Sequence, residues 1–175
     1  KCAGLGLSCY YQTVVGDNPA RLESVVRQAR GRSDLLVFSG GLGPTEDDLT
    51  KQTVARAFGD TLRFDEAELE KIRAFFTAWG RTMPENNKKQ AMVPTHGRKI
   101  PNANGTAPGM IFEDQAAPGK YAVLLPGPPA ELIPLFEKQA EPYLCGKQPE
   151  TIRSAMVKIC GVGESKAAEM IRDLT

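Results

Sequence analysis

The chain has 175 residues, of which 41% are hydrophobic and 25% are charged, and its formal net charge at pH 7 is +1. This length and composition predict a globular protein of one domain or slightly more, with enough mass to bury a core. The balanced charge argues against nucleic acid as a partner, and since no apolar run approaches the roughly 20 residues that span a bilayer, we expect no membrane partner either.

The first elements of the chain alternate between strand and helix patterns. Residues 7–15 are rich in β-branched and aromatic residues and predict a strand. Residues 17–31 predict a helix, for which Asp17 or Asn18 can serve as N-cap and Gly31 suits the stop. The six residues before the strand resemble the end of a helix, so we expect that further residues of the protein precede this sequence.

A second strand and a second helix follow. The short apolar run at 34–39 is typical of a strand buried on both faces, and residues 47–58 show a helical pattern. Strand, helix, strand and helix in this order predict a parallel sheet with helices on its faces.

The middle of the chain is more helical. Residues 64–80 predict a helix that starts with Asp65 and Glu68 at capping-box spacing. Residues 83–94 predict a further short helix bounded by prolines, and residues 98–114 predict a strand, a turn-rich loop and a second strand.

The last third of the chain predicts one more strand–helix pair and a tail. Residues 120–127 form a strand pattern, and residues 128–144 form a helical pattern in which Pro134 should cause a kink or a late start. Residues 145–150 predict a linker, and residues 151–175 predict a strand, a glycine turn and a helix. Because one strand and one helix cannot bury a core alone, we expect this tail to pack against a partner chain in a homodimer.

Cysteine and histidine usage offers little for a metal centre or a catalytic triad. Cys2, Cys9, Cys145 and Cys160 form no CxxC pair and fit no zinc spacing. They predict reduced, mostly buried thiols in a cytoplasmic protein, in agreement with an N-terminus that lacks a signal-peptide layout. The single histidine, His96, is predicted to be a solvated loop residue.

The segment "SGGLGPTEDDLTKQT" (39–53) contains Gly40, Gly41 and Gly43 where a strand meets a helix. The first N–H groups of a helix have no internal partner, the helix dipole adds positive charge there, and glycines let a phosphate approach the backbone. The pattern therefore predicts an anion site, although it is neither a Walker motif nor GxGxxG.

Two acidic residues, Asp47 and Asp48, follow these glycines and allow two interpretations. In the first, Asp47 caps the helix and Asp48 only interacts with its dipole. In the second, one carboxylate holds a hard cation such as Mg²⁺ opposite a bound phosphate. Two further Gly- and Pro-rich loops, at 102–110 and 124–132, are either plain turns or part of the same pocket.

Five ordered segments resemble the N-terminal domain of the competence/damage-inducible protein CinA over about residues 5–144. They are "YYQTVVGDN", "GGLGPTEDDLTKQTVA", "ENNKKQAMVP", "NANGTAPGM" and "LLPGPPAEL". That domain belongs to the molybdenum-cofactor-biosynthesis (MoaB/Mog-like) superfamily. The resemblance implies an α/β fold for residues 1–144, a three-layer α/β/α sandwich with a mostly parallel sheet. It also implies that residues 151–175 begin a small α+β second domain.

The resemblance implies a nucleotide substrate and metal-dependent hydrolysis of ADP-ribose to AMP and ribose 5-phosphate. Asp48 matches the functional aspartate and is the expected catalytic residue and ligand of a divalent metal ion, with Mg²⁺ the expected ion, and Asp47 supports it. The residues expected to bind the substrate are Gly40, Gly41, Gly43, Thr45, Asn86, Lys89, Gln90, Gly105, Thr106, Pro126, Gly127 and Pro128.

The chain departs from the family pattern at several places. Lys88 stands where arginine is usual, and the family's first strand and its C-terminal deamidase domain have no counterpart in this sequence. Two other functions remain open: a domain that binds a nucleotide or molybdopterin without turnover, and adenylyl transfer to molybdopterin.

Overall fold

The computed structural model describes residues 2–147 and 160–172. Tyr10–Pro149 form one compact unit, and Lys1–Cys9 with Glu150–Thr175 form another. The described elements of the smaller unit are a 3-10 helix, η1 (Cys2–Leu5), and one short helix, α6 (Glu164–Met170). The strand expected after residue 150 lies outside the described residues, so the predicted linker and second domain stay predictions.

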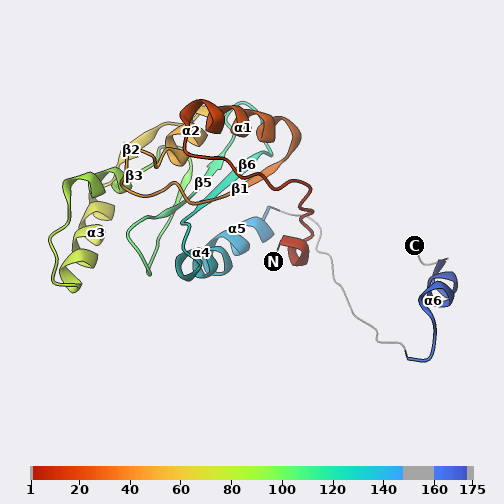
Figure 1. Cartoon of the computed structure of the whole chain (residues 1–175). Coiled ribbons are helices and arrows are strands. Elements are labelled where there is room, and N and C mark those ends of the chain that lie inside the picture. The colour runs from red at the N-terminus through yellow and green to blue at the C-terminus, as the bar shows by residue number, and fades with distance from the viewer. Residues whose placement is uncertain (1, 148–159, 173–175) are drawn as a thin grey trace. The chain divides into compact units, whose positions relative to one another are not determined.

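The larger unit is built on a four-stranded sheet with the order β1-β6-β5-β4 (Figure 1). β1 (Leu35–Ser39) pairs in parallel with β6 (Tyr121–Leu125), whereas β5 (Gly109–Glu113) runs antiparallel to β6 and to β4 (Arg98–Ile100). The prediction of a mostly parallel sheet is therefore only partly confirmed, since β1 and β6 are parallel whereas β5 is antiparallel to both of its neighbours. β4, β5 and β6 follow one another along the chain without a helix between them, and strands connected in this way pair antiparallel.

Helices cover the two faces of this sheet, as predicted for a three-layer sandwich. Figure 1 shows α1 (Pro19–Arg32) and α2 (Thr50–Ala57) on one side. On the other side lie α4 (Pro129–Leu135), the π-helical turn η3 (Phe136–Ala140) and α5 (Glu141–Cys145). The π-helical turn follows Pro134, which lacks an N–H group, so the expected disturbance of this helix is confirmed.

A second, two-stranded sheet was not predicted from the sequence. β2 (Leu62–Phe64) pairs antiparallel with β3 (Met92–Pro94), and the chain between them forms α3 (Glu66–Ala78) and the 3-10 helix η2 (Glu85–Ala91). Strands of three residues are too short to show an alternating pattern in the sequence. The predicted helices at 64–80 and 83–94 correspond to α3 and η2.

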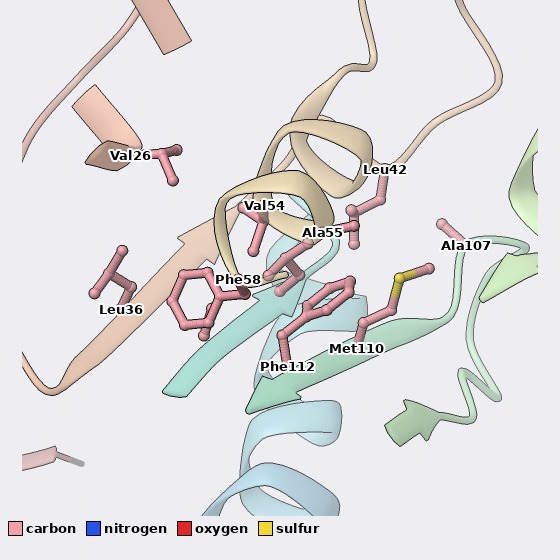
Figure 2. Packing of buried hydrophobic residues seen from close by; sticks show 11 residues of the cluster. Val26, Leu36, Leu42, Val54, Ala55, Phe58, Ala107, Met110 and Phe112 are labelled. Carbon is pink, nitrogen blue, oxygen red and sulfur yellow. The ribbon is translucent and has the colours of Figure 1, made fainter. Parts of the chain in front are cut away.

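The main core lies between the sheet and the α1–α2 layer (Figure 2). Val54 of α2 and Phe58, the C-cap of α2, are fully buried against Phe112 of β5 and Leu124 of β6, and Val26 of α1 joins them. Successive strand residues point to opposite faces of the sheet, so the buried Val123 and Leu125 lie on the face that α4 and α5 cover. Each such side chain contributes roughly 1.5–3 kcal/mol by leaving water.

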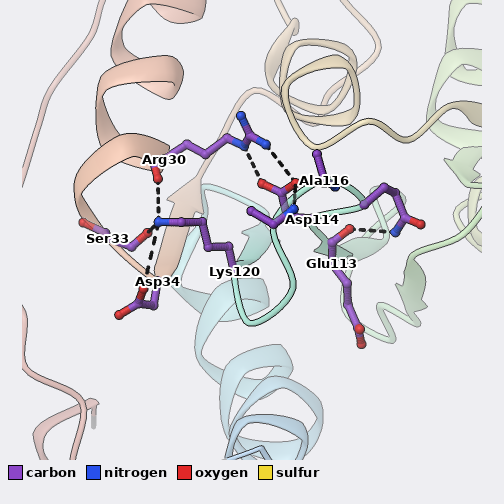
Figure 3. A network of polar contacts seen from close by, with 9 residues as sticks. Arg30, Ser33, Asp34, Glu113, Asp114, Ala116 and Lys120 are labelled. Atoms are coloured by element: carbon purple, nitrogen blue, oxygen red, sulfur yellow. Dashed lines mark hydrogen bonds and ion pairs between the residues drawn. The ribbon is translucent and has the colours of Figure 1, made fainter.

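A polar network ties α1 to the sheet at the ends where β1 and β6 begin (Figure 3). Asp114 has no exposed side-chain surface and accepts two hydrogen bonds from Arg30, the one from Nη2 at 2.9 Å, and one each from the amides of Ala116 and Ala117. Lys120 Nζ donates to the carbonyl oxygens of Arg30 and Ser33 at 2.8 and 3.0 Å. These contacts fix the end of the sheet that is remote from the glycine segment.

Two strand predictions need correction. Residues 7–15 form no strand, and Val14 is 95% exposed, because this segment has no strand beside it in the described part of the chain. β1 forms as predicted but is not buried on both faces, since it lies at the edge of the described sheet and leaves Val37 47% exposed.

Three further predictions concern the cap of α1, the burial of the cysteines and the presence of a membrane helix. Asn18, not Asp17, caps α1 by accepting from the Arg21 amide, and α1 continues through Gly31 to Arg32. Cys9, Cys145 and Cys160 are exposed, so the prediction of mostly buried cysteines is wrong for these three. Among the helices of residues 2–147 and 160–172, none combines the length and hydropathy needed to cross a membrane.

Candidate functional site

The glycine segment lies at the carboxyl ends of the two parallel strands. Gly40 (φ +89°) donates its amide to Leu125 O at 2.9 Å, so the segment is fastened to the end of β6. At Gly41 (φ +70°) a Cβ atom would collide with the Thr50 hydroxyl at the start of α2, and at Gly43 it would collide with the Asp48 carboxylate. These glycines are therefore required by backbone conformation or by close approach.

Asp48 closes the turn between the glycines and α2. Its Oδ2 accepts from Thr45 N at 2.9 Å and from Thr45 Oγ1 at 2.6 Å. Burial alone would raise the pKa of Asp48, but the bonds from Thr45 and Gly43 and the charge of Lys89 outweigh it and lower the pKa. Asp48 is therefore ionised at neutral pH.

The capping interpretation of the two acids is wrong in its detail. α2 begins at Thr50 with Leu49 as N-cap and no side-chain capping bond, so neither Asp47 nor Asp48 caps it. Asp47 is exposed, one residue before the carboxylate that organises the turn.

A buried lysine lies in α2, close to the glycine segment. Lys51 of α2 is fully buried, and its Nζ donates to the carbonyl oxygens of Lys89 and Met92. Desolvation, aided by the charge of the nearby Lys89 and opposed by that of Asp48, lowers the pKa of Lys51 from 10.5 to about 8. Lys51 therefore joins α2 to η2 and to Met92, which follows η2.

Lys89 of η2 makes a second contact between η2 and the glycine segment, because its Nζ donates a hydrogen bond to Thr45 O. The other residues expected from η2 behave differently. Asn86 is exposed, whereas Gln90 is buried and accepts a hydrogen bond from Asn87 Nδ2 at 2.8 Å. Gln90 thus has a contact within η2, while Lys89 is the residue that η2 brings to the glycine segment.

The two other predicted loops contact each other, and one reaches the glycines. A Cβ atom on Gly127 would lie 3.6 Å from Gly40 Cα, so Pro126, Gly127 and Pro128 pass beside the glycine segment. A Cβ atom on Gly105 would collide with the Glu131 carboxylate, so the loop holding Gly105 and Thr106 lies against the start of α4.

The site offers few protein ligands for a metal ion. Within the described residues there is no group of three or more His, Cys, Asp or Glu side chains arranged to hold one. Asp48 is an ionised carboxylate beside a glycine turn, which fits a cation that takes most of its ligands from phosphate and water. His96 is exposed, as predicted, and its Nδ1 lies 3.0 Å from Asp60 Oδ1.

The sequence contained a signal for Lys51 that the residue-by-residue reasoning missed. Lys51, Val54, Ala55 and Phe58 recur at helical spacing and are all buried, so a lysine occupies the apolar face of α2. A charged side chain is rarely buried unless it has partners. Asn87 gave no comparable signal, because it follows Asn86 in a polar stretch.

Comparisons with known proteins agree with this arrangement. Residues 1–145 match the family described as a probable molybdopterin binding domain. Competence-damage inducible proteins from Caldicellulosiruptor bescii and Clostridium beijerinckii are 49% and 46% identical over 174 and 172 residues. The aligned parts cover 99% and 98% of this chain but 42% and 41% of those proteins, so the chain spans less than half of either relative.

A solved structure shows the same fold. The protein CinA from Thermoplasma acidophilum, whose crystal structure is known, is 36% identical to this chain, with a TM-score of 0.60. The match covers 76% of this chain and 79% of that one. The chain therefore belongs to the family of probable molybdopterin binding domains and corresponds to the N-terminal domain of CinA proteins.

Proposed function

We propose that this chain hydrolyses the pyrophosphate of ADP-ribose to AMP and ribose 5-phosphate, with a divalent cation. The observation that supports this best is an ionised carboxylate, Asp48, held against a glycine turn at the start of a helix. Such a turn receives phosphate, and the carboxylate there needs a cation to offset the added negative charge.

The chain's own residues would bind and orient the pyrophosphate. The backbone amides of Gly41 and Leu42 and of the first turn of α2 offer donors to phosphate oxygens, and Lys89 adds a positive charge beside them. Thr45 donates two hydrogen bonds to Asp48 Oδ2 and so holds the ionised carboxylate in place beside the glycine turn. In the overall step the oxygen of water bonds to one phosphorus, the P–O–P bond breaks, and the two product phosphates take up or release the protons.

Asp48 is the residue that would hold the divalent ion, and Mg²⁺ fits a site with one carboxylate and bridging phosphates. When bound, such an ion neutralises charge that develops on the phosphate oxygens and lowers the pKa of coordinated water. Without it, Lys89 and the backbone amides are the positive groups that balance the pyrophosphate.

Two alternatives share the same geometry. A binding domain without turnover would use the glycine segment equally, and adenylyl transfer to molybdopterin would replace water by an organic acceptor. We favour ADP-ribose because the resemblance to CinA covers several loops beyond the glycine segment, and we expect ADP-ribose to bind more tightly than molybdopterin. Calorimetry with both ligands tests this preference, and tighter binding of the pterin would contradict it.

Hydrolysis in ¹⁸O-labelled water tests the reaction type. The purified chain is incubated with ADP-ribose and Mg²⁺, and the products are analysed by mass spectrometry. We expect AMP and ribose 5-phosphate, with one ¹⁸O atom in one of them. AMP joined to an acceptor without label would indicate adenylyl transfer, and intact ADP-ribose with measurable binding would indicate a binding domain.

A further inference from the structure

Lys51 is a buried charged residue to which the proposed reaction assigns no role. It is the second residue of α2 and has no exposed surface, and its Nζ donates hydrogen bonds to Lys89 O and, at 3.4 Å, to Met92 O. Lysine is almost never fully buried unless it is paired, and both of these partners are uncharged carbonyl groups. Because burying an ammonium group between neutral partners is costly, we expect its charge to have a role.

The contacts of Lys51 lead to the glycine segment through Lys89. Lys51 binds the backbone carbonyl of Lys89, and the Lys89 side chain donates a hydrogen bond to Thr45 O. Thr45 in turn donates to Asp48 Oδ2 from its amide at 2.9 Å and from its hydroxyl at 2.6 Å. A continuous set of contacts therefore joins Lys51 to the carboxylate of the proposed phosphate site.

Positive charge exceeds negative charge around Lys51. Lys89 of η2 and Asp48 of the turn are the two charged side chains that act on the Lys51 ammonium group, and the N-terminal end of α2 adds the positive end of its dipole. β3 and β6 contain no charged residue, and Arg30 of α1 is paired with Asp114 at the remote end of the sheet. An anion bound at the glycine segment would offset this excess.

We propose that Lys51 is a positioning residue for the phosphate site and that it acts in its protonated form. Its ammonium group holds the Lys89 backbone so that the Lys89 side chain reaches the glycine segment, and its charge strengthens the attraction for a bound anion. Lys51 is fully buried and so does not touch the ligand itself. With a pKa of about 8, Lys51 is half protonated at about pH 8 before the anion binds, so binding should take up a proton.

The ligand's identity rests on the proposed function, but this role can be tested without turnover. ADP-ribose and, separately, inorganic sulfate are titrated by calorimetry in the absence of divalent ions. Neither anion changes its charge between about pH 7 and 10, so a pH dependence of binding reports the protein. Each titration is repeated in two buffers of different ionisation enthalpy, which gives the number of protons taken up. The proteins are the full chain, Lys51→Met and Arg56→Met, the last being a matched control because Arg56 is an exposed cation of the same helix.

We expect the unaltered chain to take up about half a proton per bound anion at pH 8, and to bind roughly ten-fold more weakly at pH 10 than at pH 7. Lys51→Met should bind about ten-fold more weakly at pH 7, without proton uptake and with no further loss as the pH rises. Arg56→Met should behave like the unaltered chain. A purely structural role of Lys51 would change stability but not the proton count.

Binding by the unaltered chain without proton uptake, proton uptake that persists in Lys51→Met, or no binding of either anion would overturn the inference. The measurement on the unaltered chain remains decisive if Lys51→Met folds poorly. If ADP-ribose binds with proton uptake but is never hydrolysed when Mg²⁺ is added, the proposed reaction fails and the role of Lys51 stands. If sulfate alone shows the proton uptake, the identity of the ligand fails and the role of Lys51 again stands.

Discussion

Lys51 shows how a single residue can join two parts of the candidate site. Its ammonium group lies in a fully buried position between carbonyl oxygens of Lys89 and Met92, while the Lys89 side chain holds Thr45. Folding therefore removes the Lys51 ammonium group from water, and the pKa of Lys51 falls from 10.5 to about 8.

Between pH 8 and 10.5 the folded chain carries a neutral Lys51, whereas the unfolded chain carries a protonated one. Since the unfolded state binds more protons, stability rises with pH in this window. We expect the free energy of unfolding to increase by on the order of 2–3 kcal/mol relative to Lys51→Met over this range. Denaturant titrations of both proteins at pH 8, 9 and 10 measure the difference. A difference that stays constant or shrinks would contradict the assigned burial.

At the residue scale, the sequence motifs predicted which residues lie close together but not the contacts that depend on packing alone, and the roles expected of the motif residues stay predictions. Gly40, Gly41, Gly43, Thr45, Asp48 and Lys89 lie together as expected. Lys51 and Glu131 were missed because their roles depend on contacts with chain segments far away in the sequence. Such contacts arise from tertiary packing and leave only weak local signals.

At the scale of elements, the junction between β1 and α2 depends on two adjacent glycines for different reasons. Gly40 needs only its positive φ, since a Cβ there meets open space, whereas Gly41 needs its positive φ and also lies against Thr50. Gly40→Ala should therefore cost about 1–2 kcal/mol through backbone strain. Gly41→Ala should cost more and displace the start of α2, which should weaken ADP-ribose binding.

The matched control for both variants is Gly31→Ala in α1, where a Cβ meets nothing and the backbone is helical. It should be neutral or stabilising by up to about 1 kcal/mol. Melting temperatures and ADP-ribose titrations of the three variants rank the effects. Equal losses for Gly40→Ala and Gly41→Ala would show that contact with Thr50 is unimportant.

The elements themselves were largely predictable, and the exceptions have physical causes. Caps, prolines and apolar periodicity located α1, α3 and the kinked helix at 128–144. The segment 7–15 has strand composition but no neighbour in the described sheet, and composition cannot supply a hydrogen-bonding partner. Whether β5 runs parallel or antiparallel is a property of chain connection, which periodicity does not report.

For the whole molecule, the parallel pairing of β1 with β6 separates stability from chemistry. The glycine segment lies where these strands end, and the network of Arg30, Asp114 and Lys120 lies where they begin. Asp114→Asn should lower the free energy of unfolding by on the order of 2–4 kcal/mol, because Arg30 loses its charged partner. The kcat and KM for ADP-ribose should stay unchanged below the melting transition. A change in kcat would show that the two ends are coupled.

The oligomeric state is a separate proposal at this scale. α6 has no buried residue; its Met170 is 70% exposed, and its C-cap, Ile171, is 46% exposed. We propose that a second copy of the chain covers them in a homodimer. Light scattering at micromolar concentration should give twice the 19.0 kDa chain mass, and Met170→Ser with Ile171→Ser should reduce it to one chain. A monomer before mutation would contradict the proposal.

The most direct test of the whole account compares Asp48→Asn with Asp47→Asn in ADP-ribose hydrolysis. Asparagine keeps the size of aspartate and can still accept a hydrogen bond from Thr45. The free energy of unfolding should therefore change by at most about 1–2 kcal/mol. Removing the charge that would hold the cation should lower kcat by several orders of magnitude for Asp48→Asn. Asp47→Asn should remain close to the unaltered chain. Release of AMP by the unaltered chain with Mg²⁺ and its near-complete loss in Asp48→Asn is the predicted result; near-normal release by Asp48→Asn would contradict the proposed site.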